Sequence, residues 1–285
     1  MKNVVPTGKH QKLESRQENY WLWYLEGKRL DEDAYYEDAI ECYEAAIAMR
    51  PGDYWAWYQR GHALAELGCY DEAIASFDRA LAIRPTNYWA WYSRGYILLE
   101  ECDRFEEAIA SFDRALNTRP SDYWAWYRRG DALRYLHRHQ EAIDSFDRAL
   151  SVRPGDYWAW YRRGDVLRYL HRHREAIEAY NRALECESDR WEVWYKLGEL
   201  HRRLGCYPEA IFSYSRAIEI EPNDTYVWYN QACCCALLGR IDWAIYSLKR
   251  AISLQPLYRE LARKDLDFEV IRHGDRFKTL LEEQA

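Results

Sequence analysis

The sequence predicts an all-α solenoid, in which similar pairs of helices stack one after another along the chain. The first observation is the motif Asp-Tyr-Trp-Ala-Trp-Tyr, which starts at residues 53, 122 and 156 and, with Asn in first place, at residue 87. The second is a motif like Glu-Ala-Ile-Ala-Ser-Phe-Asp-Arg-Ala-Leu, which follows each copy. The third is a set of prolines, at residues 51, 85, 120, 154, 222 and 256, spaced by 34 or 35 residues or by twice 34. Self-similarity at such a period is typical of a solenoid.

Each repeat is expected to contain two antiparallel helices. In the second repeat Trp57, Gly61 and Leu64 are spaced i, i+4 and i+7, which places them on one face of a helix. Gly68 permits a tight turn, and the next helix carries alanines and a phenylalanine on one face. Pro85 ends that helix, because proline cannot continue a helix and disfavours helical dihedrals at the residue before it. One such pair cannot bury its apolar face alone, so neighbouring pairs must stack.

The order of these residues resembles the tetratricopeptide (TPR) repeat. The residues that carry the resemblance in the second repeat are Trp57, Gly61, Leu64, Gly68, Tyr70, Ala73, Phe77, Ala80 and Pro85. Seven units fit the pattern: Tyr20–Pro51, Tyr54–Pro85, Tyr88–Pro120, Tyr123–Pro154, Tyr157–Ser188, Trp191–Pro222 and Thr225–Pro256. The third has one extra residue near Cys102, and the seventh has Ala232 in place of the glycine. The resemblance implies a right-handed α-solenoid of seven TPR helix hairpins plus C-terminal capping helices, as in bacterial tandem TPR arrays.

Three regions follow from this organisation. Residues 1–17 are interpreted as a disordered or polar lead-in, since they lack the apolar centre of a secretion signal. Residues 18–256 hold the seven repeats. Residues 257–285 resemble the terminal helices of such arrays, and the segment from Asp265 to Leu281 should cover the apolar face of the last repeat.

Composition restricts the class of protein further. With 48% hydrophobic and 31% charged residues the chain has enough apolar side chains for a core. The sequence contains no run of about 18 apolar residues, so no transmembrane helix is expected. The eight cysteines have no framework spacing, which predicts reduced thiols and a cytoplasmic protein. Consecutive residues of a helix point about 100° apart, so the run from Cys233 to Cys235 is interpreted as small buried residues rather than a metal site.

Catalytic chemistry has no support in the sequence. The chain shows neither a phosphate-binding glycine loop nor a nucleophile motif, and nearly every polar residue recurs with the repeat. We therefore predict that the protein is not an enzyme and needs no cofactor and no metal. Two turn segments, 137–139 and 171–173, read His-Arg-His. They are interpreted as solvated turn residues, the alternative being a zinc or nickel site.

The two tryptophans of the first motif are two residues apart, so they point about 200° apart around the helix. The second is expected to pack inside the helix pair. The first shares a different stripe with the following tyrosine, and the TPR resemblance implies that this stripe lines a concave groove. The predicted partner-binding groove residues are Trp124, Tyr127, Arg128, Asp131, Arg134, Trp158, Tyr161, Arg162, Asp165, Arg168, Tyr195 and Arg202.

Charge is unevenly distributed along the predicted groove. Residues 1–120 carry 14 basic and 21 acidic side chains (net −7), whereas residues 121–205 carry 16 and 14 (net +2). Arg134, Arg168 and Arg202 recur on successive repeats, and because like charges repel we expect them to share an anionic ligand. The alternative is structural: the tryptophans pack between repeats, and the arginines pair with neighbouring aspartates or stack on tyrosines.

Three functions remain from these observations. The first is a scaffold or adaptor that binds a protein or peptide segment, acidic with apolar anchors, in the groove; complex-assembly factors are one class of such scaffolds. The second is binding of single-stranded nucleic acid, which uses arginines with stacking aromatics, although the chain is acidic overall and such binders are usually basic. The third is self-association. The groove positions that bind C-terminal carboxylates in some TPR proteins hold other residues here, among them Tyr127, Asp131, Tyr161 and Asp165.

Overall fold

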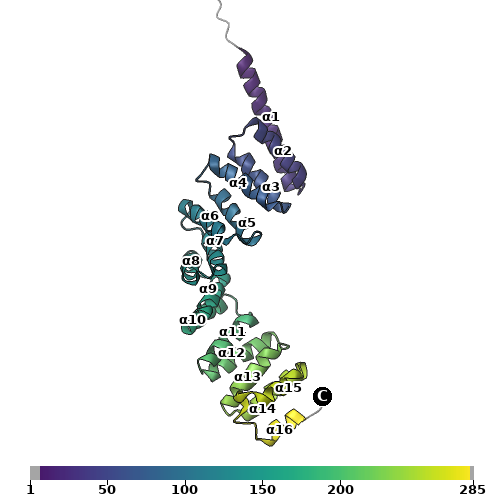
Figure 1. Ribbon diagram of the computed structural model, residues 1–285, viewed down its shortest axis with the longest axis vertical. Coiled ribbons are helices and arrows are strands. Elements are labelled where there is room, and N and C mark those ends of the chain that lie inside the picture. Colours follow the sequence, from purple (N-terminus) through teal and green to yellow (C-terminus); the bar gives the residue numbers. More distant parts are fainter. Residues whose placement is uncertain (1–6, 283–285) are drawn as a thin grey trace, which may run out of the picture. The chain divides into compact units, whose positions relative to one another are not determined.

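The computed structural model describes the backbone of residues 7–282 and the side chains of residues 19–282. Within these residues the chain forms sixteen α-helices and one short 3-10 helix, with no strand (Figure 1). The helices follow one another as adjacent antiparallel pairs, which confirms the prediction of an all-α fold of helix hairpins.

Seven pairs precede a short C-terminal cap. The pairs are α1 (Thr7–Glu32) with α2 (Tyr36–Met49), α3 (Tyr54–Glu66) with α4 (Tyr70–Ile83), α5 (Tyr88–Glu100) with α6 (Phe105–Thr118), α7 (Tyr123–Tyr135) with α8 (His139–Val152), α9 (Tyr157–Tyr169) with α10 (His173–Cys186), α11 (Trp191–Arg203) with α12 (Tyr207–Ile220), and α13 (Thr225–Leu237) with α14 (Ile241–Leu254). The cap consists of α15 (Leu257–Lys264), the 3-10 helix η1 (Leu266–Phe268) and α16 (Asp275–Glu282).

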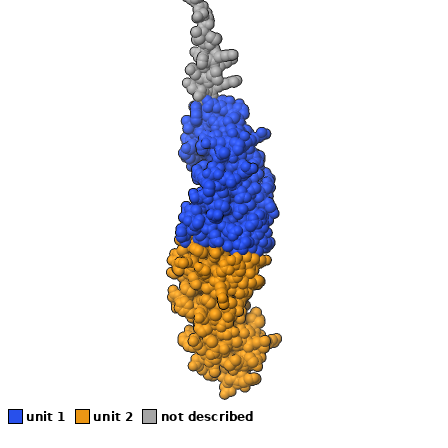
Figure 2. Space-filling view, turned by 90° about the vertical axis from the view of Figure 1, so that its left-hand side faces the viewer, with its two compact units in different colours: residues 1–154 blue, residues 155–285 orange. Residues whose placement is uncertain are grey.

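The chain divides into two compact units (Figure 2). Unit 1 comprises residues 1–154 and holds the first four pairs, and unit 2 comprises residues 155–285 and holds the other three pairs and the cap. Within each unit every helix packs on the next one along the chain, as expected when each pair buries its apolar face against its neighbours.

In every pair but the last, where Ala232 stands instead, a glycine in the first helix lets the second helix approach closely. A Cβ atom on Gly61 would lie 2.8 Å from Cε1 of Phe77, and one on Gly198 would lie 2.4 Å from Cε1 of Tyr214. Both aromatic rings are fully buried. The spacing of glycine and aromatic residue in the motif therefore reflects a direct contact between the two helices of a pair.

The motif also explains where the helices begin and turn. The side chain of Asp122 accepts a hydrogen bond from the backbone N–H of Ala125, so the aspartate that opens the motif caps the first helix. At the turn within each pair one residue adopts a left-handed conformation, which Gly68 does at φ 76°. His137 and His171 occupy this position in their repeats, both at φ 57°.

The N-terminal helix is longer than its counterparts. It begins at Thr7, so residues 7–17, which the sequence analysis assigned to the lead-in, have a helical backbone. This stretch is rich in Lys, Gln, Glu and Arg, which favour helix, and it contains no proline. Residues 1–6 of the lead-in lie outside the described residues.

The C-terminal cap covers the last helix pair of unit 2. Phe268, Ile271 and Phe277 are buried in one cluster with Trp228, Ala244 and other residues of α13 and α14. The apolar face of the last repeat is thus covered as predicted. No helix among the described residues is both long and apolar enough to span a bilayer.

Candidate interaction surface

The second tryptophan of the motif is a structural residue, as predicted. Nε1 of Trp57 donates a hydrogen bond to the carbonyl oxygen of Pro51 at 3.0 Å, six residues earlier. The same bond recurs at Trp91, Trp126, Trp194 and Trp228, at 2.7, 2.7, 2.9 and 2.8 Å. Trp57 also packs against the buried clusters on both sides of its helix. The hydrogen bond of this tryptophan therefore links the start of one repeat to the end of the preceding one.

The first tryptophan is exposed to solvent. Its exposed fraction is 47% at Trp89, 45% at Trp124 and 47% at Trp158. The ring of Trp124 meets Tyr123 and Tyr127 edge-on, with centroids 5.0 and 6.1 Å apart. The neighbouring helix therefore does not cover these indoles, in contrast to the packed alternative considered above.

Arginines that follow a second helix, or in the case of Arg190 precede the next first helix, lie over these exposed rings. The guanidinium of Arg119 lies 4.3 Å from the ring centroid of Tyr88 and 5.0 Å from that of Trp89. Arg153 stands in the same relation to Tyr123 and Trp124, at 4.6 and 5.6 Å. In unit 2, Arg190 lies 5.0 Å from the Tyr157 ring and 5.7 Å from the Trp158 ring. Guanidinium groups over tryptophan faces are cation–π contacts.

These stacked arginines are not among the predicted site residues. The sequence contains a signal for Arg119 and Arg153, since arginine precedes proline in Arg50-Pro51, Arg84-Pro85, Arg119-Pro120 and Arg153-Pro154, but Arg190 lacks it. We use the name Trp–Arg surface for the exposed tryptophans with their stacked arginines, taken within each unit by itself: Trp89 with Arg119 and Trp124 with Arg153 in unit 1, and Trp158 with Arg190 in unit 2.

In unit 1 the predicted groove residues divide into buried and exposed ones. Tyr127 and Asp131 are only 7% and 5% exposed, so they lie beneath the surface and are not available to a partner. Arg128 forms an ion pair with Glu100 of the preceding repeat. Nε of Arg134 donates to Asp131 at 3.2 Å, and its guanidinium lies 4.2 Å from the ring centroid of Tyr135.

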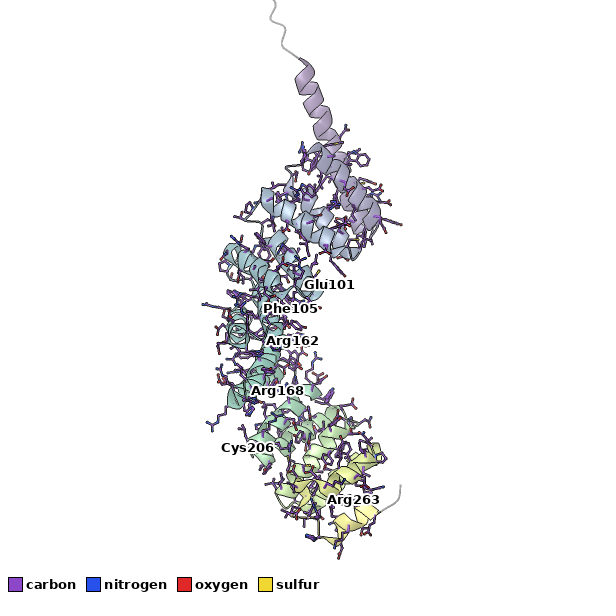
Figure 3. All side chains as sticks on the ribbon, in the orientation of Figure 1. Glu101, Phe105, Arg162, Arg168, Cys206 and Arg263 are labelled. Carbon is purple, nitrogen blue, oxygen red and sulfur yellow. The ribbon has the colours of Figure 1, made fainter. Side chains whose placement is uncertain are left out.

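In unit 2 Asp165 is the centre of a hydrogen-bond network. Its Oδ1 accepts from Nζ of Lys196 at 2.6 Å and from the hydroxyl of Tyr180 at 2.7 Å. Lys196 also donates to the hydroxyl of Tyr161 at 2.6 Å. Nε of Arg168 lies 3.9 Å from the same aspartate oxygen. Arg162 and Arg168 are labelled in Figure 3 on α9, and both are partly buried.

The last two predicted residues also contact other side chains of unit 2. The Tyr195 ring lies 6.2 Å from that of Tyr214, and burial raises the pKa of Tyr195 to about 12. Arg202 has Glu199 at 3.6 Å and Asp267 of the cap at 3.4 Å. Arg134, Arg168 and Arg202 therefore each have an acidic neighbour within their own unit. This corrects the argument from repulsion, because the row of arginines is compensated by the chain and needs no shared anion.

Family models match most of the repeat region. Models of the tetratricopeptide repeat match residues 54–87, 76–110, 121–186, 161–225 and 213–246, and a TPR repeat model matches residues 35–68. The chain belongs to the tetratricopeptide repeat family. A model of the protein prenyltransferase alpha subunit repeat also matches residues 105–136. A comparison with curated proteins finds no match.

Solved structures of TPR proteins resemble this TPR chain in fold. YrrB, described as a TPR protein with an unusual peptide-binding site, is 24% identical with a TM-score of 0.59, over 66% of this chain and 98% of its own. MamA from Desulfovibrio magneticus RS-1 is 24% identical with a TM-score of 0.56, over 60% and 97%. A tetratricopeptide repeat protein from Parabacteroides merdae is 18% identical with a TM-score of 0.59, over 86% and 97%.

One group of three possible metal ligands occurs among the described residues of the TPR array. The thiol of Cys233 and the carboxylates of Asp265 and Asp267 have ligand atoms within 4.8 Å of one another. The Tyr229 hydroxyl donates to Asp265 at 2.7 Å, and Asp267 faces Arg202. Burial raises the pKa of the Cys233 thiol, which keeps it protonated. The group is thus explained as the contact that holds the cap on α13.

Proposed function

We propose that this TPR array is a non-enzymatic protein–protein interaction scaffold, or adaptor, that holds a segment of a partner protein on the Trp–Arg surface. The observation that carries the proposal is that a half-exposed tryptophan with a stacked arginine recurs at the same position of successive repeats, within unit 1 and again in unit 2. Tryptophan, tyrosine and arginine contribute most of the binding energy at protein interfaces. A row of exposed aromatic side chains is typical of an interaction surface.

The chemistry of the surface favours an acidic segment with apolar anchors. Arg119 and Arg153 are exposed, and cation–π contacts hold them beside the indoles. An acidic side chain of the partner would meet these guanidinium groups while an apolar one covers Trp89 or Trp124. Arg128 and Arg134 contribute less, because each already has an acidic partner within the chain. The partner's carboxylates are therefore expected next to Arg119 and Arg153.

Two further observations support the proposal. The description of YrrB shows that a TPR protein of this fold can carry a peptide-binding site. All eight cysteines are free thiols, which suits a reducing compartment and supports a cytoplasmic scaffold. Complex assembly is one role that such a scaffold would serve.

Partner capture from a native lysate tests the proposal. The variant combines Trp89→Ala, Trp124→Ala and Trp158→Ala, with nuclease added to half of each sample. The matched control is Trp243→Ala with Phe212→Ala, which removes aromatic rings 63% and 60% exposed on α14 and α12. We expect the triple variant to lose at least about 90% of the captured protein, since each interface tryptophan is worth about 1 kcal/mol or more. Equal recovery with both variants would contradict the proposal, and loss on nuclease treatment would indicate nucleic acid instead.

A further inference from the structure

A cavity of about 490 Å³ opens between the second and third repeats of unit 1. Its walls include His62 and Glu66 of α3, Tyr70 of α4, Tyr96 of α5, and Glu101, which follows α5 and is labelled in Figure 3. Two carboxylates and several tyrosine rings thus face one space, and among the described residues no lysine or arginine lines it. The composition of the walls is that of a site for a cation.

Two other junctions between repeats are closed by a cation from the chain itself. Lys196, the sixth residue of α11, reaches back to Tyr161 and Asp165 of the preceding repeat, with its Nζ 4.2 Å from the Tyr161 ring centroid. Arg128, the sixth residue of α7, likewise pairs with Glu100 and lies 5.1 Å from the ring centroid of Tyr96. In both cases a long basic side chain contacts a tyrosine and a carboxylate one repeat earlier.

Ser93 occupies this position in α5, beside the cavity. Its hydroxyl reaches only the hydroxyl of Tyr58, at 3.5 Å. Glu66 ends α3 as Glu100 ends α5, so it is the counterpart of the carboxylate that Arg128 neutralises. Across the described residues Glu66 has no lysine or arginine partner, and its one ionic neighbour is His62 at 3.9 Å. The cavity is therefore the place that a basic side chain fills at the other two junctions.

We propose that this cavity binds an arginine or lysine side chain of a protein partner, which supplies from outside the cation that Arg128 and Lys196 supply from within. The carboxylates of Glu66 and Glu101 would neutralise the bound charge, and the rings of Tyr70 and Tyr96 would contact it as the Tyr161 ring contacts Lys196. That the cation belongs to a protein rests on the function proposed above; the site itself does not. The partner would then carry a basic anchor in addition to its acidic and apolar ones.

A titration with a small probe tests the site without any partner. The probe is N-acetyl-arginine amide at low salt, and its control is N-acetyl-citrulline amide, which has nearly the same shape but no charge. The reporter is the NMR signal of the Ile97 side-chain methyl groups, because Ile97 lines the cavity. We expect a saturable shift with the arginine probe and none with citrulline. Equal shifts with both probes, or no shift with either, would overturn the proposal.

Variants of the cavity make the test specific. Ser93→Arg introduces an arginine at the position that Arg128 occupies in α7. Its side chain should fill the cavity and neutralise the carboxylates, and so weaken binding of the arginine probe at least about tenfold. Ser93→Ala is the matched control and should leave binding within about twofold. Glu66→Gln with Glu101→Gln keeps the shape of the walls and should also weaken binding about tenfold. Should Ser93→Arg fail to fold, the double variant Glu66→Gln with Glu101→Gln tests the proposal. Unchanged affinity of this variant for the arginine probe would overturn the proposal.

The two proposals can fail separately. If the arginine probe does not bind but the triple tryptophan variant loses its partner, the cavity proposal falls and the scaffold proposal stands. If the probe binds and the triple variant keeps its partner, the cavity proposal stands and the Trp–Arg surface is not the binding surface.

Discussion

Removing the amino group of Lys196 is expected to destabilise the region around α9 and α11. This ammonium group donates at 2.6 Å both to Asp165 and to the Tyr161 hydroxyl. The two charged side chains are 20% and 19% exposed, so the pair is mostly buried. Lys196→Met keeps most of the aliphatic chain and removes the charge, which leaves the Asp165 carboxylate with only the more distant Arg168, at 3.9 Å, as a cation.

The magnitude follows from the burial of the pair. Breaking a fully buried ion pair by removing one partner costs about 3–5 kcal/mol, and an exposed pair is worth about 0–1 kcal/mol. For a pair with about a fifth of each side chain exposed we expect a loss of about 2–3 kcal/mol. Adding Asp165→Asn to Lys196→Met should recover about 1 kcal/mol or more, because no unpaired charge is then buried.

Hydrogen exchange of the amides in α9 and α11 is the suitable assay, because repeat arrays open in segments rather than in one transition. The control is Arg182→Met, which breaks the exposed pair of Arg182 with Glu185 on α10 and should cost about 0.5 kcal/mol or less. If Lys196→Met matched this control, or if the effects of Lys196→Met and Asp165→Asn were additive, the network would not be the stabilising feature described here.

Three further outcomes are expected. Gly198→Ala should destabilise the fold by about 1–3 kcal/mol, since its Cβ would lie 2.4 Å from Tyr214. A Cβ at Gly155 would have nothing within 4 Å, so Gly155→Ala should be neutral. Denaturant unfolding compares the two variants, and equal effects would contradict the packing argument. A hydrogen bond to Asp31 raises the pKa of His62. The contribution of His62 to stability should therefore be full below about pH 6.5 and should fade as the pH rises through the pKa of His62 in the folded protein. His62→Gln should lower stability at pH 5.5 more than at pH 9, and a pH-independent difference would refute this. In the native protein a thiol reagent should modify the exposed Cys69 and Cys186 and spare the buried thiols from Cys233 to Cys235. Reaction of these buried thiols without denaturant would contradict their burial.

The helix pairs could be predicted from the sequence because their causes are local and repeated. The glycine of the first helix and the aromatic residue of the second, such as Gly61 and Phe77, recur at fixed spacing in the first six pairs because they touch there. The aspartate that opens the motif recurs because it caps a helix. The exception is the start of α1, where residues 7–17 belong to no repeat and periodicity could not assign them.

The interaction surface could be predicted only in part, because it depends on contacts between repeats. The periodicity placed the two tryptophans of the motif on different faces of the helix but did not predict how exposed each side chain is. It also did not show that Tyr127 and Asp131 lie beneath the surface. The arginines seemed uncompensated because Arg128 finds its carboxylate, Glu100, one repeat earlier. The stacking of Arg119 was missed for a different reason, since its tyrosine and tryptophan lie at the start of α5, far from it in sequence within the same helix pair.

Site-specific photo-crosslinking in cells can show directly whether the Trp–Arg surface contacts a partner protein. A photoreactive phenylalanine derivative would replace Trp89, Trp124 or Trp158 in turn, with replacement of Trp243 on α14 as the control. We expect the same partner protein to crosslink from all three positions of the Trp–Arg surface and not from the control position. A partner that crosslinks from the control position alone would contradict it.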